Sequence, residues 1–319
     1  MVNVTEIKAS RQGYGEGLME LGEINPNVVV IGLDLTESTA THSFKNKYPD
    51  RFFSIGIAEQ NGMSIAAGLS LVGKIPYVST FAVFSAGRCW EQVRMSVCYS
   101  NCNVKIAGSH AGLTTGPDGA SHQATEDIAI MRVLPRMTVI VPCDAVEARK
   151  ATVASASIYG PVYIRLSREP TPVITDKNSL FEIGKANVIK EGKDVGIIAC
   201  GVMVYQALLA AEILEKENIS AKVVNLHTIK PIDEDTIIKT ARDCGCIVTV
   251  EEHQVLGGMG SAVAEVLVKN YPVPMEIMGL EDKFGESGNA NELLEKYSLK
   301  DKNIIEKVKK ILKIKRKGG

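Results

Sequence analysis

One carboxylate stands alone in an otherwise uncharged stretch, SIGIAEQNGMSIAAGLSLVG, residues 54–73. Glu59 lies where an apolar, strand-like run changes to the small and apolar residues of an expected helix. A glutamate in a first helical turn can simply interact with the helix dipole, which contributes about 0.3–1 kcal/mol. A carboxylate in so apolar a segment can equally share a proton with a reacting partner. The stretch by itself leaves both interpretations open.

The densest group of reactive side chains lies in GSHAGLTTGPDGASHQATED, residues 108–127. It contains His110, Asp118 and His122, and therefore two of the five histidines of the chain. Histidine is suited to proton transfer near neutral pH and to hydrogen bonds with anionic or hydroxylated substrates. A turn at Asp118 with histidines capping a following helix explains the same residues without any function. A zinc site is a third interpretation, but no cysteine joins and a further ligand at close spacing is missing.

These residues follow strands of an expected parallel sheet. Short β-branched runs alternate with longer helical stretches, and several runs are apolar throughout, as is typical of a parallel sheet covered on both faces. Ligands bind such sheets in loops at the carboxyl ends of the strands. Asp144 and Glu147 have the spacing of a helix capping box. In the first half, strands are expected at 27–35, 75–81, 103–108, 137–142 and 161–167, and helices at 60–72, 86–100 and 144–158.

The alternation of strands and helices is interrupted once and then restarts. Prolines, turn residues and charges without a period fill the interruption near 170–192. We therefore expect an α/β protein of two doubly wound domains with mostly parallel sheets, residues 1–172 and 193–319, joined by a linker over 173–192. In the second half, strands are expected at 195–201, 221–226 and 246–253, with helices between and after them.

Two further stretches are interpreted as structural. The C-terminal stretch NIIEKVKKILKIKRKGG has apolar residues at 304, 305, 308, 311 and 312, which form one face of a helix. We expect this helix to pack on its own domain, with a membrane surface or a partner as the alternative. LGGMGSAVAEVL, residues 256–267, is expected to form a tight strand-to-helix turn, because the acidic residue of a dinucleotide site does not follow at a clear strand end.

Composition excludes several functional classes. The 319 residues include 36 basic and 37 acidic side chains, whereas non-specific binding to nucleic acid usually requires a basic excess. No apolar run reaches the roughly 18 residues that span a bilayer, and MVNVTEIKASRQ lacks the features of a signal peptide. The seven cysteines are scattered without metal-ligand spacing apart from the close pair Cys244 and Cys246, which indicates free thiols in a reducing compartment. We expect a cytoplasmic protein that binds neither nucleic acid nor membrane.

Motifs in order along nearly the whole chain resemble the transketolase family. The pyrimidine-binding domain of that family is similar to GIAEQNGMSIAAGLSLVG, YVSTFAVFSAGRCWEQVR and GSHAGLTTGPDGASHQATEDIAIMRVLPRMTVIVPCDAVEA, and the match continues through GPVYIRLSRE, VNLHTIKPID and EEHQVLGGMG. The family holds thiamine diphosphate through Mg²⁺ with a G-D-G triplet and a downstream asparagine, on an N-terminal domain. This sequence contains no G-D-G triplet. The resemblance thus implies the C-terminal subunit of a split transketolase, with an N-terminal subunit that binds the diphosphate and Mg²⁺ in an α2β2 assembly.

The resemblance also implies which residues meet the cofactor. Glu59 matches the glutamate that hydrogen-bonds N1′ of the aminopyrimidine and so favours the imino form that removes the proton from C2 of the thiazolium. Phe81 and Phe84 match the aromatic residues that flank the pyrimidine ring. His110 and His122 match catalytic histidines that reach the substrate and the reactive carbon. No metal ligand is implied on this chain.

The remaining implied contacts are with the substrate. Asp118 matches an aspartate that binds a donor hydroxyl, and Arg11, Ser38 and Arg168, together with His110, resemble the contacts of the family to sugar phosphates. Arginine suits this role because it is permanently charged and binds phosphate with two parallel hydrogen bonds.

The implied activity is transfer of a two-carbon ketol unit from a ketose phosphate to an aldose phosphate. The first alternative is the β subunit of a 2-oxoacid dehydrogenase E1 component, which has a similar length and domain order. The loop GPDGASHQ and the arginine of LSRE favour a sugar phosphate instead. Deoxyxylulose phosphate synthase shares the fold but normally carries both halves in one longer chain. The last alternative is a non-catalytic regulatory subunit of the same fold, which would have no need of Glu59.

Overall fold

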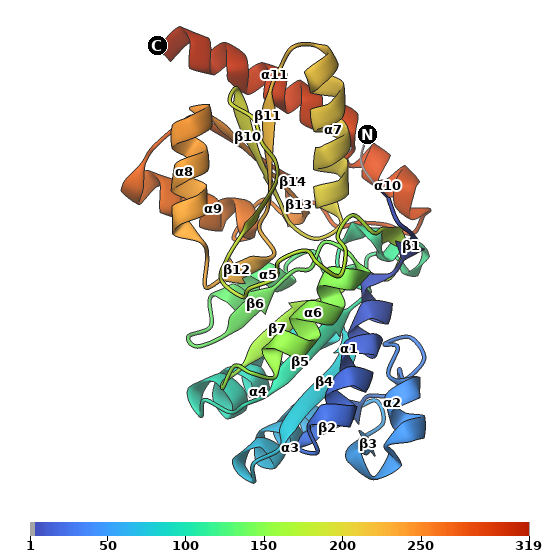
Figure 1. The fold of residues 1–319 in the computed structure, drawn as a ribbon. Coiled ribbons are helices and arrows are strands. Elements are labelled where there is room, and N and C mark those ends of the chain that lie inside the picture. The colour runs from blue at the N-terminus through green and yellow to red at the C-terminus, as the bar shows by residue number, and fades with distance from the viewer. Residues whose placement is uncertain (1–3, 319) are drawn as a thin grey trace.

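The computed structural model describes residues 4–318 and contains two α/β domains, one above the other in Figure 1. The first domain is built on a seven-stranded sheet with the order β12-β6-β7-β5-β4-β2-β3. All neighbours in it are parallel except β12 (Thr228–Lys230), which comes from the second half of the chain and pairs antiparallel with β6. The parallel strands are β2 (Val28–Gly32), β3 (Phe52–Ser54), β4 (Ile75–Phe81), β5 (Lys105–Ser109), β6 (Thr138–Ile140) and β7 (Val162–Arg165).

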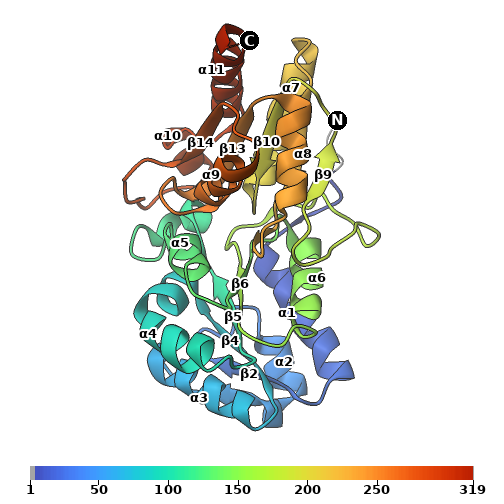
Figure 2. The same cartoon turned by 90° about the vertical axis from the view of Figure 1, so that its left-hand side faces the viewer.

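Helices cover both faces of this sheet, as Figure 2 shows. Successive side chains of a strand point to opposite faces, so Val30 and Tyr77 pack in one buried cluster, while Ile31 and Val78 pack in another. One face carries α1 (Ser10–Ile24), α2 (His42–Lys47) and α6 (Ala145–Ser155). The other carries α3 (Glu59–Leu71), α4 (Trp90–Gln92) with its flanking turns, and α5 (Asp127–Arg132).

The second domain repeats this arrangement on a five-stranded sheet with the order β14-β13-β10-β11-β9. Its strands are β9 (Asn187–Lys190), β10 (Val195–Ala199), β11 (Ala221–Asn225), β13 (Ile247–Gln254) and β14 (Met275–Leu280), and only β9 is antiparallel. One face packs on α7 (Met203–Lys216) and α11 (Asp301–Gly318), and the other on α8 (Glu234–Cys244) and α9 (Met259–Asn270). The α/β class and the mostly parallel sheets are therefore confirmed. The remaining elements are β1 (Ile7–Lys8), which pairs with β8 (Thr171–Pro172), and the short α10 (Ala290–Lys296).

The structure differs from the sequence prediction at particular elements. The helix predicted over 86–100 begins at residue 83 and consists of two π-helical stretches, Val83–Arg88 and Val93–Tyr99, on either side of α4. Wider π turns change which side chains share a face of a helix. The α-helical periodicity of the sequence therefore did not mark the start at Val83. The predicted linker over 173–192 contains β9, the edge strand of the second sheet. The domain boundaries themselves stay predictions. The sequence prediction did not include α1, α2, α10, β1, β3, β8, β9, β12 or β14.

The capping box is formed only in part. Asp144 accepts a hydrogen bond from the backbone N–H of Glu147, as predicted. The Glu147 carboxylate, however, accepts from the N–H of Cys143, one residue before the cap, and also from the Asn225 side chain of the second domain. Glu147 thus links the two domains instead of closing the box.

The C-terminal apolar face packs on its own domain, as predicted. Ile304, Val308 and Ile311 are fully buried in the cluster that also contains the residues of α7. Among residues 4–318, no helix is both long enough and apolar enough to cross a membrane. All seven cysteines are buried and free.

The close approach of α1 to α6 places the N-terminus of α1 at the sheet edge, and it requires glycine at position 13. A Cβ on Gly13 would lie 1.8 Å from the carbonyl oxygen of Ala145. We expect Gly13→Ala to lower the free energy of unfolding by about 1–3 kcal/mol or more, because α1 must move away. Gly68→Ala, on an exposed position of α3 where nothing lies within 4 Å, should instead raise it by about 0.5–1 kcal/mol. Urea unfolding of both variants checks this, and equal stability of the two would contradict the described packing.

Candidate active site

The candidate residues gather at one edge of the first sheet. Parallel strands end at the same edge, and the neighbours β7, β5, β4, β2 and β3 are each followed by a segment that carries candidates. These are Arg168 after β7, the loop with His110, Asp118 and His122 after β5, Phe81 and Phe84 at and after the end of β4, Ser38 after β2, and Glu59 after β3. Arg11 joins them from the first turn of α1.

An aromatic cluster forms the centre of this edge. The rings of Phe81 and His110 stack with their centroids 3.9 Å apart, and Phe84 lies beside Phe81 at 5.9 Å. His122 meets both phenylalanines edge-on, at 5.8 Å and 5.6 Å. The four predicted residues therefore form one group of flat rings, in which two imidazoles lie beside two apolar phenyl rings.

His110 is held in an uncommon conformation. Its φ is +57°, its carbonyl accepts a hydrogen bond from the hydroxyl of Thr115, and its Nδ1 lies 2.9 Å from the hydroxyl oxygen of Ser109. Burial, with smaller effects from Arg11 and Arg168, lowers the pKa of His110 from 6.5 to about 3. The imidazole is therefore neutral near pH 7 and can both donate and accept hydrogen bonds.

This lowered pKa predicts a pH dependence of stability. Between pH 6.5 and about 3 the unfolded chain binds a proton at His110 that the folded chain does not bind, so stability falls as the pH falls through this window. His110→Asn removes the group and keeps a residue type that tolerates positive φ. We expect the loss of stability between pH 7.5 and pH 5 to be smaller in this variant by about 2 kcal/mol. Urea unfolding at both pH values measures the free energy of unfolding. If its pH dependence is the same in the variant, the lowered pKa of His110 is ruled out.

Glu59 is buried at the start of α3, only 2% exposed, and its partner is a residue that sequence reasoning missed. Arg88 donates from Nη1 to Oε2 of Glu59 at 2.8 Å, and its guanidinium lies 4.2 Å from the centroid of the Phe84 ring. The sequence did contain one signal for Arg88: it lies four residues after Phe84 in one helical stretch, and residues at this spacing are neighbours on a helix. Through Arg88, the carboxylate is connected to the aromatic cluster.

A second group, which we call the arginine pair, lies beside His110. Arg11 donates from Nε to the carbonyl of Arg168 at 3.1 Å and from Nη1 to the carbonyl of Ser38 at 2.7 Å. Burial, and next the charge of Arg168, lower the pKa of Arg11. Two neighbouring guanidinium groups repel each other, so this position favours an anion.

The carboxylate of Asp118 lies within this group. Arg168 pairs with Asp118, whose Oδ2 is 3.5 Å from Nε, and with Glu169. Both carboxylates offset the charge of the arginine pair in the described chain. The predicted substrate residues are thus together, although Asp118 faces Arg168 and Ser38 contributes its carbonyl oxygen rather than its hydroxyl.

Serine hydroxyls fix the position of the arginine pair. Ser10 at the start of α1 accepts a hydrogen bond from the N–H of Ser167 at 2.7 Å, and the two hydroxyl oxygens are 3.0 Å apart. Both serines are buried. This contact joins the first turn of α1 to the segment after β7, and so places Arg11 next to Arg168.

The residues present suit a flat, hydrogen-bonding ring. A cavity of about 330 Å³ is lined by residues 57–61 and Arg88, so it lies beside Glu59 and its ion-pair partner. The hydroxyl of Thr80, next to Phe81, is buried without a hydrogen-bond partner in the described chain. Within residues 4–318, no group of three or more histidine, cysteine, aspartate or glutamate side chains is arranged to hold a metal ion.

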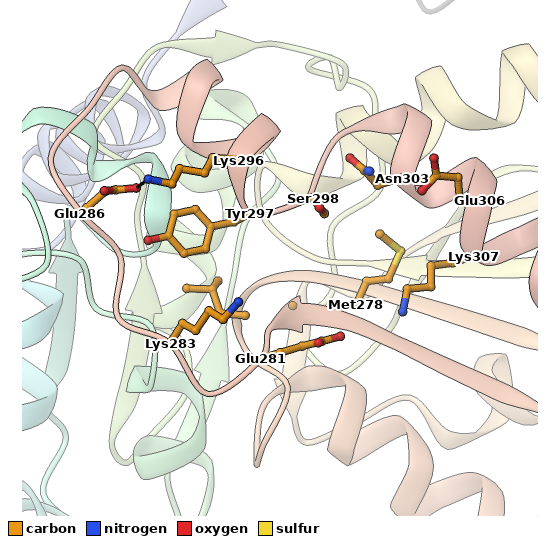
Figure 3. A pocket seen from close by; sticks show the side chains of 12 residues that line it. Met278, Glu281, Lys283, Glu286, Lys296, Tyr297, Ser298, Asn303, Glu306 and Lys307 are labelled. Carbon is orange, nitrogen blue, oxygen red and sulfur yellow. Dashed lines mark ion pairs between the residues drawn. The ribbon is translucent and has the colours of Figure 1, made fainter.

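A larger cavity, of about 490 Å³, lies in the second domain between the end of β14 and the helices α10 and α11 (Figure 3). Its charged residues include both signs, and Lys296 and Glu286 form an ion pair at one side of it. Three lysines and three glutamates line it, so their formal charges balance. The charged residues that line it are Glu281, Lys283, Glu286, Lys296, Glu306 and Lys307.

Comparisons with known proteins match both domains. Residues 7–173 match the family model described as transketolase, pyrimidine binding domain, and residues 184–304 match transketolase, C-terminal domain. The putative transketolase C-terminal section of Methanocaldococcus jannaschii is 46% identical over 96% of this chain and 97% of its own length. The 6-deoxy-6-sulfo-D-fructose transketolase subunit SqwH of Clostridium sp. is 42% identical over 92% of each chain. A solved structure described as split gene transketolase, inactive beta4 tetramer, is 52% identical, covers 97% of this chain and 99% of its own, and superposes with a TM-score of 0.91.

Proposed function

This chain belongs to the transketolase family, and from that premise we propose that it is the C-terminal subunit of a split, thiamine diphosphate-dependent transketolase. Its reaction would be the transfer of a two-carbon ketol unit from a ketose phosphate to an aldose phosphate. The observation that carries this proposal is the buried Glu59 at the aromatic cluster, connected to it through Arg88. Removing a carboxylate from water costs several kcal/mol before any compensation, so a hydrogen bond with the cofactor would stabilise Glu59 in this buried position.

Each residue of the site has a proposed task. When bound, thiamine diphosphate supplies the nucleophilic carbon that cleaves the bond beside a ketose carbonyl and carries the two-carbon unit. Phe81 and Phe84 would hold the aminopyrimidine by contact with their rings. The ion pair with Arg88 uses Oε2 of Glu59, so in the described chain Oε1 is available for a hydrogen bond with a ring nitrogen.

The histidines would move and hold protons on the substrate side. Neutral His110 can donate a hydrogen bond to a substrate oxygen or accept one from a hydroxyl, and its stacking on Phe81 fixes its plane. His122, which is only partly buried, meets the same ring from its edge and can exchange protons with the substrate. Two imidazoles beside one apolar face suit a reaction that transfers protons between hydroxyl and carbonyl oxygens.

The arginine pair would bind the anionic end of the sugar. Arg11 and Arg168 present planar guanidinium groups that match phosphate geometry, and Asp118 would exchange its contact with Arg168 for a donor hydroxyl. One relative is named for a ketose that carries a sulfonate, which supports an anionic sugar as the substrate class. We propose phosphate as the anion for this chain.

The proposed enzyme needs a second chain. We propose an N-terminal subunit that holds the diphosphate and Mg²⁺, assembled with this chain as α2β2. The solved relative named as an inactive beta4 tetramer supports the view that the C-terminal subunit alone does not turn over substrate. A cytoplasmic location agrees with seven buried, free cysteines, because thiols stay reduced there.

A comparison of donors by the purified pair of subunits tests the proposed reaction. With thiamine diphosphate, Mg²⁺ and an aldose phosphate acceptor, the pair should release an aldose from a pentose phosphate donor. A sulfonated ketose and pyruvate or a branched 2-oxoacid are the comparison donors. Turnover of 2-oxoacids alone would contradict the proposal and favour the E1 alternative.

A further inference from the structure

We propose that Glu252, a residue of the second domain, is a positioning residue of the active site: its carboxylate anchors the loop that carries His110 and His122. The inference rests on the proposed function, and it gives the second domain a task in the reaction although none of the candidate residues lies there. No contact between Glu252 and substrate is required.

The Glu252 carboxylate accepts hydrogen bonds from the loop after β5. It lies at the end of β13, 3% exposed, and its Oε2 accepts hydrogen bonds from the backbone N–H of Thr114 at 2.9 Å and from the Thr114 hydroxyl at 2.8 Å. The same carboxylate fills the space beside Gly112, where a Cβ would lie 2.3 Å from its carboxyl carbon. With φ +80°, Gly112 also has a conformation that side chains rarely adopt. The loop is thus shaped to receive this one side chain.

From Thr114 the connection to His110 is one residue long. The hydroxyl of the next residue, Thr115, donates to the carbonyl of His110 at 2.7 Å, and His110 has the positive φ that needs such support. The Thr115 carbonyl in turn accepts from Arg168 at 3.4 Å. A shift of the Thr114 anchor therefore moves both the ring stacked on Phe81 and a contact of the arginine pair.

Buried charges hold Glu252 itself in place. Arg165, at the end of β7, has Nη1 3.6 Å from Oε1 of Glu252, and its Nε donates to Asp127 at 2.9 Å. Its Nη2 donates to the carbonyls of Ala124 and Glu252. Arg165 thus connects three segments: β13 through Glu252, the loop after β5 through Ala124, and α5 through Asp127. Buried networks of this kind are strongly oriented when every member is paired.

The neighbouring Glu251 provides a matched control. It is also buried on β13, and its carboxylate also accepts two hydrogen bonds, from the N–H groups of Met259 and Gly260 at 2.7 Å each. Both of those groups belong to α9 of its own domain, so Glu251 has no bond to the loop after β5. The two glutamates therefore differ mainly in which segment they hold.

The test is a pair of double-mutant cycles in the assembled enzyme. The amide of Glu252→Gln has one acceptor oxygen and cannot face both Thr114 and Arg165 as the carboxylate does. This variant should lower kcat by about 10- to 100-fold, since a small displacement of reacting groups has effects of this size. Thr114→Val, which removes the hydroxyl donor and leaves the backbone bond, should lower kcat less. If Glu252 acts through Thr114, the double variant should lose less than the product of the two single losses. Glu251→Gln should leave kcat near that of the unchanged enzyme. Its effect on kcat and that of Thr114→Val should multiply in the double variant, as expected for independent sites.

A second readout does not depend on activity. Amide hydrogen exchange of residues 110–123, measured by mass spectrometry on the same complexes, should be faster in Glu252→Gln and unchanged in Glu251→Gln. Equal exchange in both variants, or multiplicative losses in both cycles, would overturn the positioning role. If the unchanged pair of subunits shows no ketol transfer at all, the proposed function fails, and the exchange comparison still decides whether Glu252 anchors the loop.

Discussion

Replacing Glu59 by glutamine should lower kcat of the assembled enzyme by about 10²–10⁴-fold, the usual range for loss of one acid–base group. The amide keeps the size of the side chain and can still accept from Arg88, so the buried start of α3 should remain folded. It cannot take up the proton that a carboxylate shares with a ring nitrogen. Steady-state turnover at saturating thiamine diphosphate, with the ketose phosphate as donor, measures the effect.

Two controls separate this role from a structural one. Glu16, an exposed residue of α1 that pairs with Lys8, provides Glu16→Gln as a substitution of the same chemistry away from the sheet edge, and its turnover should be unchanged. The thermal unfolding midpoint of Glu59→Gln should stay near that of the unchanged complex. Full turnover by Glu59→Gln would refute the assigned role of the carboxylate, and the regulatory-subunit alternative would then gain support.

The second large effect is expected at the arginine pair. Arg168→Ala should raise the KM for the ketose phosphate by about 10- to 100-fold, because a hydrogen bond to a charged group contributes about 1.5–3 kcal/mol. Arg168→Lys should recover only part of this loss, since lysine keeps the charge without the planar fork. The chemical step should be less affected, because the anionic end of the donor is not where bonds change.

The same donor without its phosphate group provides the control for this effect. If Arg168 binds the phosphate, the Ala variant should lose most of the preference for the phosphorylated donor, while kcat/KM for the uncharged sugar stays nearly unchanged. Arg149→Ala, at an exposed residue paired with Glu20 on α1, should keep the full preference. An equal loss with both donors would show that Arg168 supports the loop rather than the phosphate.

The alternation of strands and helices, and the loop that carries most of the reactive side chains, followed from local patterns. Apolar runs such as 75–81 predicted β4 to the residue. The rule that ligands bind at the carboxyl ends of strands indicated the loop of His110, whereas Phe81 was assigned through the family resemblance. Glu59 was conspicuous because it is the only charge in its stretch. These signals depend on residues close in sequence, and a single chain displays them directly.

Contacts between distant segments were not predictable in this way. Arg88 lies 29 residues from Glu59, and the π-helical stretches that carry it shift the side chains away from the usual helical register. Glu252 lies 138 residues from Thr114, and its sequence context, EEH, does not distinguish which glutamate faces the loop and which faces α9. Alternation along β13 separates the two faces, but only the packed structure shows what each face meets.

We propose that this chain holds the half of the cofactor site that activates thiamine diphosphate, and that a second chain completes it. Titration of a fixed amount of this chain with the N-terminal subunit tests this most directly, with the rate of aldose release from a ketose phosphate followed at saturating thiamine diphosphate and Mg²⁺. We predict no turnover by either subunit alone, and a rate that rises with added partner and reaches its plateau at an equimolar ratio. Full turnover by this chain alone, or no turnover at any ratio of the two subunits, would contradict a cofactor site shared between two chains.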